Sequence, residues 1–187
     1  ERHLDPDLTI DRSLRGAVRG KVVVVTGGSS GIGEAAAIRI AEAGGKVVVV
    51  ARDEEKLAEV RKKILDAGGY AKTYSCDITD LAANDKLAKD ILKEFGHVDV
   101  LINNAGRSIR RSLALSYDRF HDFERTMQLN YFACVRLTMN LLPSMTARKS
   151  GHVINVSSIG VLTNAPRFSS YVASKAALES FARCAAS

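Results

Sequence analysis

Tyr171 and Lys175 are the two side chains in this sequence best suited to proton transfer. They stand four positions apart in SSYVASKAALESFARC, a segment with helical spacing, so they lie on one face of a predicted helix. A phenol normally keeps its proton up to about pH 10, and a neighbouring ammonium group stabilises the phenolate. The pair therefore predicts general acid/base chemistry. Because a YxxxK pattern arises by chance in about one chain of this length in three, it carries weight only with its neighbours.

Two further polar clusters follow predicted strands. Ser157 and Ser158 come directly after the apolar run at 152–156, and the sequence NNAG, from Asn103 to Gly106, comes after the run at 98–102. Open α/β sheets bind ligands at the carboxyl ends of their strands. We therefore expect both clusters at one edge of the sheet, beside the glycine-rich turn.

That turn, TGGSSGIG at residues 26–33, links an apolar strand to a helix. Gly27 and Gly31 would let the backbone turn tightly, and Gly33 with Ala36 would let the helix pack closely on the sheet. The N–H groups that open the helix would face a pyrophosphate. A glycine pattern also fits a plain strand-to-helix turn, but the flanking strand and helix favour dinucleotide binding.

The end of the second predicted strand bears on which dinucleotide binds. Counting about 20 residues from the glycine turn reaches Asp53, an acid that would indicate NAD. The apolar strand ends at Val50, however, so Arg52 is better placed. A guanidinium binds a 2′-phosphate through two parallel hydrogen bonds, with help from a second arginine or from the hydroxyl of Ser29 or Ser30. We predict NADP(H), although Arg52 at a helix start is also compatible with a solvated side chain.

A parallel sheet is needed to bring these residues together. Short β-branched runs alternate with longer stretches of helical spacing, which predicts an α/β, doubly wound parallel sheet with helices on both faces. The predicted strands span residues 21–25, 46–50, 71–76, 98–102 and 152–156. The predicted helices span residues 31–43, 54–67, 81–95, 117–147 and 169–186. The glycines Gly44-Gly45, Gly68-Gly69, Gly96 and Gly151 punctuate helix ends.

Composition narrows the class of protein. The 187 residues are 46% hydrophobic and 26% charged, which excludes disordered and fibrous chains. No apolar run approaches the roughly 20 residues that span a bilayer. The formal charge of +6 favours anionic partners such as phosphorylated cofactors, but no nucleic-acid motif is present, and we interpret most of the charge as solvated surface.

Cysteine and histidine patterns predict neither disulfides nor a metal site. Cys76, Cys134 and Cys184 are an odd number without CxxC spacing, which favours core packing in a reducing cytoplasm. His121 and Glu124 would supply only half a metal site.

The ends of the chain are less regular. Residues 1–20 are predicted to be a linker or an arm packed on the domain, and residues 21–187 to form one NADP-binding domain. The charged beginning without an initiator Met or an apolar leader predicts an internal fragment.

The combination of TGGSSGIG, NNAG, a serine thirteen positions before the tyrosine, and YVASK resembles the short-chain dehydrogenase/reductase family. The resemblance implies a Rossmann-like fold in which Tyr171 is the general acid/base and Ser158 binds the substrate carbonyl. It also implies that Lys175 binds the nicotinamide ribose and favours the phenolate. Asn130 in QLNYF would support a water-linked proton relay, and Asp77 would approach the adenine.

The expected catalytic residues are accordingly Asn130, Ser158, Tyr171 and Lys175. The expected cofactor-binding residues are Thr26, Gly27, Ser29, Ser30, Gly31, Ile32, Gly33, Arg52, Asp77, Ile78, Asn104, Ala105, Gly106, Tyr171 and Lys175. Compared with the family pattern, the sixth and seventh strands and the substrate loop between them are missing after Ser187.

A closer resemblance extends over most of the chain. NNAGRSIRRS, SYDRFHDFERTMQLNYF and SSIGVLTNAPRFSSYVASKAALESFARC are similar to bacterial long-chain fatty acyl-CoA reductases, and DPDLTIDRSLRG resembles the junction before their reductase domain in two-domain versions. This implies reduction of a long-chain fatty acyl-CoA thioester by NADPH to the fatty aldehyde, and onward to alcohol in a two-domain protein. The alternatives are a carbonyl or 3-oxoacyl thioester reductase and a noncatalytic NADP-binding domain.

Two expectations concern partners. Arg107, Arg110 and Arg111 form a basic cluster after NNAG that would meet the phosphates of CoA, or would pair with nearby carboxylates such as Asp118, Asp122 or Glu124. The family resemblance also implies a homo-oligomer formed through the two long C-terminal helices.

Overall fold

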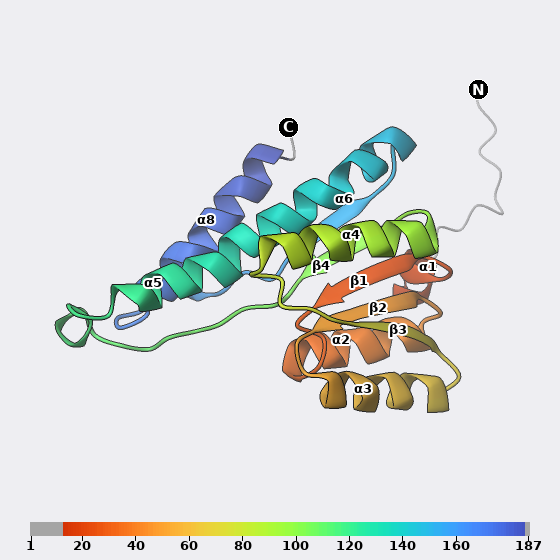
Figure 1. Ribbon diagram of the computed structural model, residues 1–187, viewed down its shortest axis with the longest axis horizontal. Helices are drawn as coiled ribbons and strands as arrows, with labels where there is room; N and C mark the ends of the chain where they lie inside the picture. Colours follow the sequence, from red (N-terminus) through yellow and green to blue (C-terminus); the bar gives the residue numbers. More distant parts are fainter. Residues whose placement is uncertain (1–12, 186–187) are drawn as a thin grey trace, which may run out of the picture.

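The apolar runs of the sequence pair as the strands of one parallel sheet in a computed structural model that describes residues 13–185 (Figure 1). The strands are β1 (Val22–Thr26), β2 (Lys46–Ala51), β3 (Tyr70–Ser75), β4 (Val100–Asn103) and β5 (His152–Asn155). They lie in the order β3-β2-β1-β4-β5, and every adjacent pair is parallel. This confirms the predicted α/β, doubly wound fold.

The helices connect and cover these strands. They are α1 (Leu14–Val18), α2 (Gly31–Glu42), α3 (Glu54–Asp66), α4 (Leu81–Phe95), α5 (Phe120–Met127), α6 (Cys134–Arg148), α7 (Gly160–Thr163) and α8 (Ser169–Ala185). A π-helical turn, Gln128–Ala133, joins α5 to α6, and a short 3₁₀ turn spans Leu113–Leu115. Within the described residues, no helix is both long enough and apolar enough to cross a membrane.

The two faces of the sheet build two cores because alternate strand residues point to opposite sides. Val23 and Val25 of β1 pack with α2 and α3, whereas Val22 and Val24 pack with α4 and α6. The helices of each core lie on opposite sides of the sheet (Figure 1). Every residue of β1 is buried, as expected for a central parallel strand. Ile154 of β5 is 41% exposed because β5 is an edge strand of the described sheet.

Several predicted strand ends were wrong by one or two residues. β1 begins one residue later than predicted and includes Thr26, and β4 begins at Val100 and includes Asn103. Strand ends follow backbone pairing, such as that of Asn103 with Asn155, and this pairing does not require apolar side chains. The polar residues at the strand ends, Thr26 and Asn103, therefore belong to the sheet.

The long helix predicted at 117–147 begins later and is interrupted. Residues 116–119 form turns, with the N–H of Ser116 bonded to Leu113 O and the N–H of Arg119 bonded to Ser116 O, so α5 starts only at Phe120. At the other end, Lys149 with φ 52° adopts the left-handed conformation that we expected of a glycine. Gly151 instead lies against Met145, where an added Cβ would come within 2.5 Å of that side chain.

The predicted linker at residues 1–20 falls partly on residues 1–12, which lie outside the described part of the chain. In the described portion, Ser13 accepts a hydrogen bond from the N–H of Gly16 and caps α1. Val18 at the end of α1 is buried in the core formed by α2 and α3. Val18 therefore anchors α1 to the core, while Leu14 at its start is exposed.

Asn84 in α4 holds together two segments that border the carboxyl edge of the sheet. The side chain is completely buried, and its Nδ2 donates to Ile78 O at 3.0 Å and to Ala133 O at 3.1 Å. Ile78 follows β3, and Ala133 ends the π-helical turn. One amide group thus ties the loop after β3 to the α5–α6 junction.

We expect Asn84→Ala to lower the free energy of unfolding by about 1–3 kcal/mol, because two buried carbonyl groups lose their hydrogen-bond donor. Urea denaturation followed by circular dichroism measures this change. Lys89→Ala, an exposed position on the same helix, serves as the matched control. Equal midpoints for the two variants would contradict the role given to Asn84.

Candidate active site

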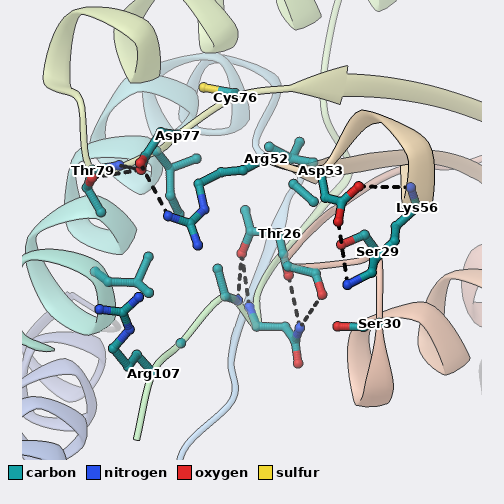
Figure 2. Close-up of a pocket in the computed structure, with 18 of the residues that line it drawn as sticks. Thr26, Ser29, Ser30, Arg52, Asp53, Lys56, Cys76, Asp77, Thr79 and Arg107 are labelled. Atoms are coloured by element: carbon teal, nitrogen blue, oxygen red, sulfur yellow. Dashed lines mark hydrogen bonds and ion pairs between the residues drawn. The ribbon is translucent and has the colours of Figure 1, made fainter. Parts of the chain in front are cut away.

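A cavity of about 640 Å³ lies at the carboxyl ends of β1, β2 and β4 (Figure 2). Of the residues expected to bind a cofactor, its lining contains Thr26, Gly27, Ser29, Ser30, Ile32, Arg52, Asp77, Ile78, Asn104, Ala105 and Gly106. Gly31, Gly33, Tyr171 and Lys175 are not part of this lining. The structure thus brings residues from four separated segments to one hollow, and Lys175 lies beside its Gly106 end.

The hydroxyl of Thr26 joins the two loops that form the floor of the cavity. Thr26 is completely buried, its Oγ1 donates to Ile102 O at 3.3 Å, and it accepts from the N–H groups of Asn104 and Ala105, both at 3.1 Å. The Asn104 amide returns the contact by donating to Thr26 O at 3.0 Å and Gly27 O at 3.1 Å. The loops after β1 and β4 are thereby fixed relative to each other.

The glycine turn has the space and the free donors that a pyrophosphate needs. Gly27 has a left-handed φ of 64°, and an added Cβ at Gly33 would lie 2.3 Å from Gly27 O, so α2 starts very close to the turn. Ser30 precedes α2, but its side chain makes no capping hydrogen bond to the first turn. The first N–H groups of α2 are therefore available to an anion, and these residues fit a dinucleotide phosphate.

Arg52 and Asp77 form one end of the cavity. Arg52 NH1 lies 3.7 Å from Asp77 Oδ2, and both side chains are largely exposed. Burial alone would raise the pKa of Asp77, but hydrogen bonds from the hydroxyl and N–H of Thr79, together with the charge of Arg52, lower it. Asp53, the acid that simple counting selects, also lines this cavity, and it caps α3 by accepting from the N–H of Lys56. A ligand phosphate would therefore meet a guanidinium that only an exposed ion pair restrains.

Asn130 and Lys175 lie in a buried network at the other end. The Asn130 Oδ1 accepts from the N–H of Arg107 at 2.8 Å, and its Nδ2 donates to Arg107 O and to Ser174 Oγ, both at 2.9 Å. Lys175 Nζ donates to Val156 O at 2.7 Å, and burial lowers its pKa. A Cβ on Gly106 would lie 3.4 Å from both Asn130 Oδ1 and Lys175 Nζ, so the NNAG loop touches both residues.

Ser158 and Tyr171 are brought to the same region by contacts between the loop after β5 and α8. Lys175 holds Val156 at the start of this loop. Ser158 Oγ accepts from the N–H of Gly160 at 3.1 Å, and Gly160 is so near Val172 that an added Cβ would lie 3.0 Å from its side chain. The partly buried Tyr171 packs edge-on against Phe168, with 6.5 Å between ring centroids. The loop carrying Ser158 is therefore fixed against the helix that carries Tyr171.

The cavity lining contains three cations that the sequence did not predict to bind a cofactor. Lys56 lies four residues after Arg52, a spacing in the first turn of a helix that would have indicated it. Arg107 was placed in the basic cluster that follows NNAG, and the structure puts it at the cavity instead. Arg125 comes from α5, and nothing in the sequence indicates that α5 reaches this hollow.

Comparison with known proteins agrees with this geometry. The family model described as short chain dehydrogenase matches residues 21–187. A protein named fatty acyl-CoA reductase from Acinetobacter baylyi is 59% identical over 175 residues, which cover 94% of this chain and 59% of that protein. The chain thus spans less than two thirds of that relative.

Two solved structures have the same fold. A metagenomic short-chain oxidoreductase in complex with NADP superposes with a TM-score of 0.85 and 35% identity, covering 90% of this chain and 76% of the other. An NAD⁺-bound xylitol dehydrogenase superposes with a TM-score of 0.84 and 28% identity, covering 89% and 64%. Both neighbours hold a nicotinamide cofactor. The family match, the close relative and the cavity together establish that this chain belongs to the short-chain dehydrogenase family of oxidoreductases, which use a nicotinamide cofactor.

Proposed function

We propose that this chain reduces the thioester carbonyl of a long-chain fatty acyl-CoA to an aldehyde, with NADPH as the hydride donor. The observation that supports this most strongly is its 59% identity, over 94% of its length, to a relative named fatty acyl-CoA reductase. Similarity at this level over the segments that border both the cavity and Tyr171 favours a common substrate class.

The preference for NADPH is inferred from charge at the end of the cavity. Arg52 and Lys56 both line it, and Asp53, which lines it too, caps α3 and forms an exposed ion pair with Lys56 Nζ at 3.4 Å. Two cations favour a 2′-phosphate over a bare ribose hydroxyl, and a guanidinium can bind phosphate through two hydrogen bonds. Asp77 would release Arg52 to the phosphate at little cost because their ion pair is exposed.

The proposed chemistry assigns one task to each polar residue near Tyr171. The cavity lined by Thr26, Gly27 and Arg52 would hold NADPH, which would supply the hydride for the carbonyl carbon. Tyr171 donates its phenolic proton to the carbonyl oxygen, and the Ser158 hydroxyl donates a hydrogen bond to the same oxygen as charge develops. The positive charge of Lys175, four residues away on α8, favours the phenolate that remains.

Asn130 has a different task in this proposal. Its three hydrogen bonds join the NNAG loop to α8, so it positions Lys175 and the loop relative to each other. It lies in the π-helical turn between α5 and α6, a local irregularity that is frequent at functional sites. In this arrangement, a water held beside Lys175 would return a proton to Tyr171.

The hemithioacetal formed in this way collapses without a covalent enzyme intermediate. The C–S bond breaks, the hydroxyl proton passes to the leaving thiolate, and the products are aldehyde and free CoA thiol. No cysteine is needed as a nucleophile. Cys134 is completely buried, and desolvation raises its pKa to about 11, so it stays a neutral thiol in the core.

The first test measures NADPH oxidation and thiol release together, with palmitoyl-CoA and the natural full-length protein. We expect equal rates of the two signals. Tyr171→Phe should lower both by about 10²–10⁴-fold because the proton donor is lost, while NADPH binding stays unchanged. Tyr117→Phe is the control, since this tyrosine is 87% exposed. NADPH oxidation with ketones but without thiol release would favour a carbonyl reductase instead.

The second test concerns cofactor choice. We expect Arg52→Gln to lower kcat/KM for NADPH by about 10–100-fold and to leave kcat/KM for NADH nearly unchanged, because only NADPH carries the phosphate that Arg52 would bind. Arg61→Gln removes an exposed cation from the neighbouring helix α3 and controls for net charge. An equal loss of kcat/KM with both cofactors would contradict the assignment of Arg52 to the 2′-phosphate.

A further inference from the structure

Two adjoining hollows lie outside the cofactor cavity, on the side of the molecule that carries α8. The first, of about 390 Å³, is lined by Arg110, Arg111, Ser112, Leu115 and Arg167. The second, of about 440 Å³, shares Arg111 and Arg167 with it and continues along apolar residues of α8, including Val172, Ala173 and Ala176. Val172 directly follows Tyr171 in the chain. A Cβ added to Gly160 would lie 3.0 Å from Val172 Cγ2 and 3.2 Å from Ser158 Oγ, so the apolar hollow borders the loop that carries Ser158 and is continuous with the arginine-rich one.

The arginine-rich hollow is built from two distant segments that are fixed by their backbones. The N–H of Arg111 donates to Arg167 O at 2.7 Å, which joins the loop after β4 to the loop before α8. Arg167 has a φ of 72°, a left-handed conformation that costs a non-glycine residue energy and persists only where the surroundings impose it. The two guanidinium groups therefore start from constrained backbones.

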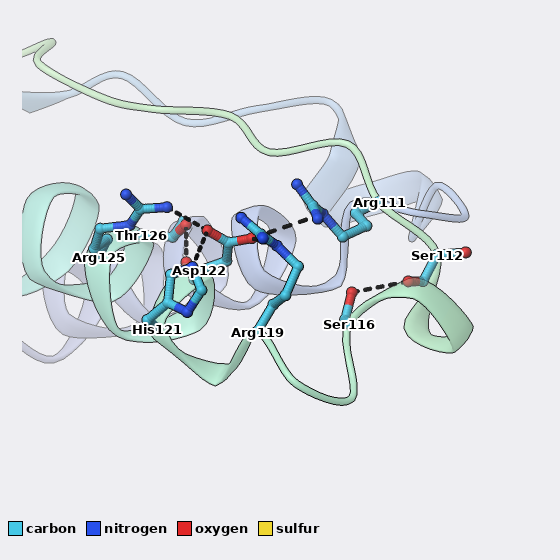
Figure 3. Close-up of polar contacts among 8 residues, drawn as sticks. All are labelled: Arg111, Ser112, Ser116, Arg119, His121, Asp122, Arg125 and Thr126. Atoms are coloured by element: carbon cyan, nitrogen blue, oxygen red, sulfur yellow. Dashed lines mark hydrogen bonds and ion pairs between the residues drawn. The ribbon is translucent and has the colours of Figure 1, made fainter.

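The positive charge of this region exceeds the negative charge that faces it. The carboxylate of the buried Asp122 pairs with Arg119 at 3.1 Å, with Arg111 at 3.7 Å, and with Arg125 (Figure 3). One carboxylate thus serves three guanidinium groups. Within residues 13–185, Arg110 and Arg167 take part in no ion pair. Arg111 Nε is buried and, in this part of the chain, has no hydrogen-bond partner.

We propose that the arginine-rich hollow binds the phosphate groups of the CoA portion of the substrate, with Arg110 and Arg167 as the main contacts. The inference rests on the proposed function and names the part of the protein that recognises its substrate. Phosphate is the anion that guanidinium groups bind best in a planar, two-pronged geometry, and several arginines fit several phosphate charges. The adjoining apolar hollow then carries the arm that links those phosphates to the thioester at Tyr171.

This arrangement divides the basic cluster after NNAG between two ligands. Arg107 lines the cofactor cavity, whereas Arg110 and Arg111 line the hollow on the α8 side. One loop thus contacts the cofactor through Arg107 and the substrate through Arg110 and Arg111, and the two ligands meet beside this loop. Substrates without phosphate groups should bind weakly, while the chemical step at Tyr171 would be unchanged.

The experiment titrates adenosine 3′,5′-bisphosphate into the natural full-length protein by calorimetry, with NADPH saturating so that the cofactor cavity is closed to the probe. The variant is Arg110→Gln with Arg167→Asn, because Asn tolerates the left-handed backbone at 167. The control is Arg61→Gln with Lys93→Gln, which removes the same charge from exposed positions on α3 and α4. Melting temperatures establish that both variants are folded.

We expect the first variant to weaken binding of the bisphosphate at least about tenfold, and the control to leave it within about twofold, because two charge-assisted contacts are lost only in the first. Its KM for palmitoyl-CoA should rise with kcat unchanged, and its activity on an N-acetylcysteamine thioester, which has no phosphate, should stay the same. Inorganic phosphate and adenosine 5′-monophosphate, as weaker competitors, distinguish recognition of CoA from general anion binding.

Unchanged bisphosphate affinity in the first variant, or an equal loss in the control variant, would overturn the assignment. The calorimetric result does not depend on turnover. Absence of thiol release would thus defeat the proposed acyl-CoA reduction, whereas unaltered calorimetric binding would defeat this site alone.

Discussion

The buried hydroxyl of Thr26 is the contact on which the whole site depends. It closes hydrogen bonds to the backbone around residues 102–105, so the carboxyl ends of β1 and β4 cannot separate without leaving buried polar groups unpaired. The start of α2 is held against this junction by the close approach of Gly33 to Gly27. The parallel pairing of the strands and the Thr26 hydroxyl thus shape a cavity that fits a dinucleotide, without any contribution from charged side chains.

Asn130 performs the corresponding task on the other side of the site. Its amide spans the NNAG loop and Ser174 of α8, and Lys175 reaches from the same helix to Val156 at the start of the Ser158 loop. The π-helical turn lets a side chain from the α5–α6 connection reach this buried position. These contacts fix the NNAG loop, α8 and the Ser158 loop relative to one another, whereas the two hydrophobic cores of the sheet lie elsewhere.

Positive charge is distributed unevenly over this surface. Some cations are paired conventionally, as Arg136 is with Asp85, through a two-pronged contact that lowers the pKa of that carboxyl to about 2. Others face hollows: Arg52 and Lys56 line one end of the cofactor cavity in exposed ion pairs with Asp77 and Asp53, and Arg110 and Arg167 line the hollow beside α8. From composition alone, we interpreted the excess of basic residues as solvated surface. In the structure, part of this excess lies around hollows suited to phosphate.

The sequence by itself determined the fold class, the glycine turn and the family, because continuous apolar runs, helical spacing and the order of motifs along the chain can all be read directly from it. It also determined that Tyr171 and Lys175 share a helix face. The late start of α5, the π-helical turn and the left-handed Lys149 were decided by tertiary structure, since backbone pairing and packing override propensity at element ends. Only the folded chain shows that Arg107 lines the cofactor cavity whereas Arg110 lines the hollow beside α8. Likewise, Arg111 and Arg167 are 56 positions apart and meet through strand order and loop contacts, which no local sequence pattern encodes.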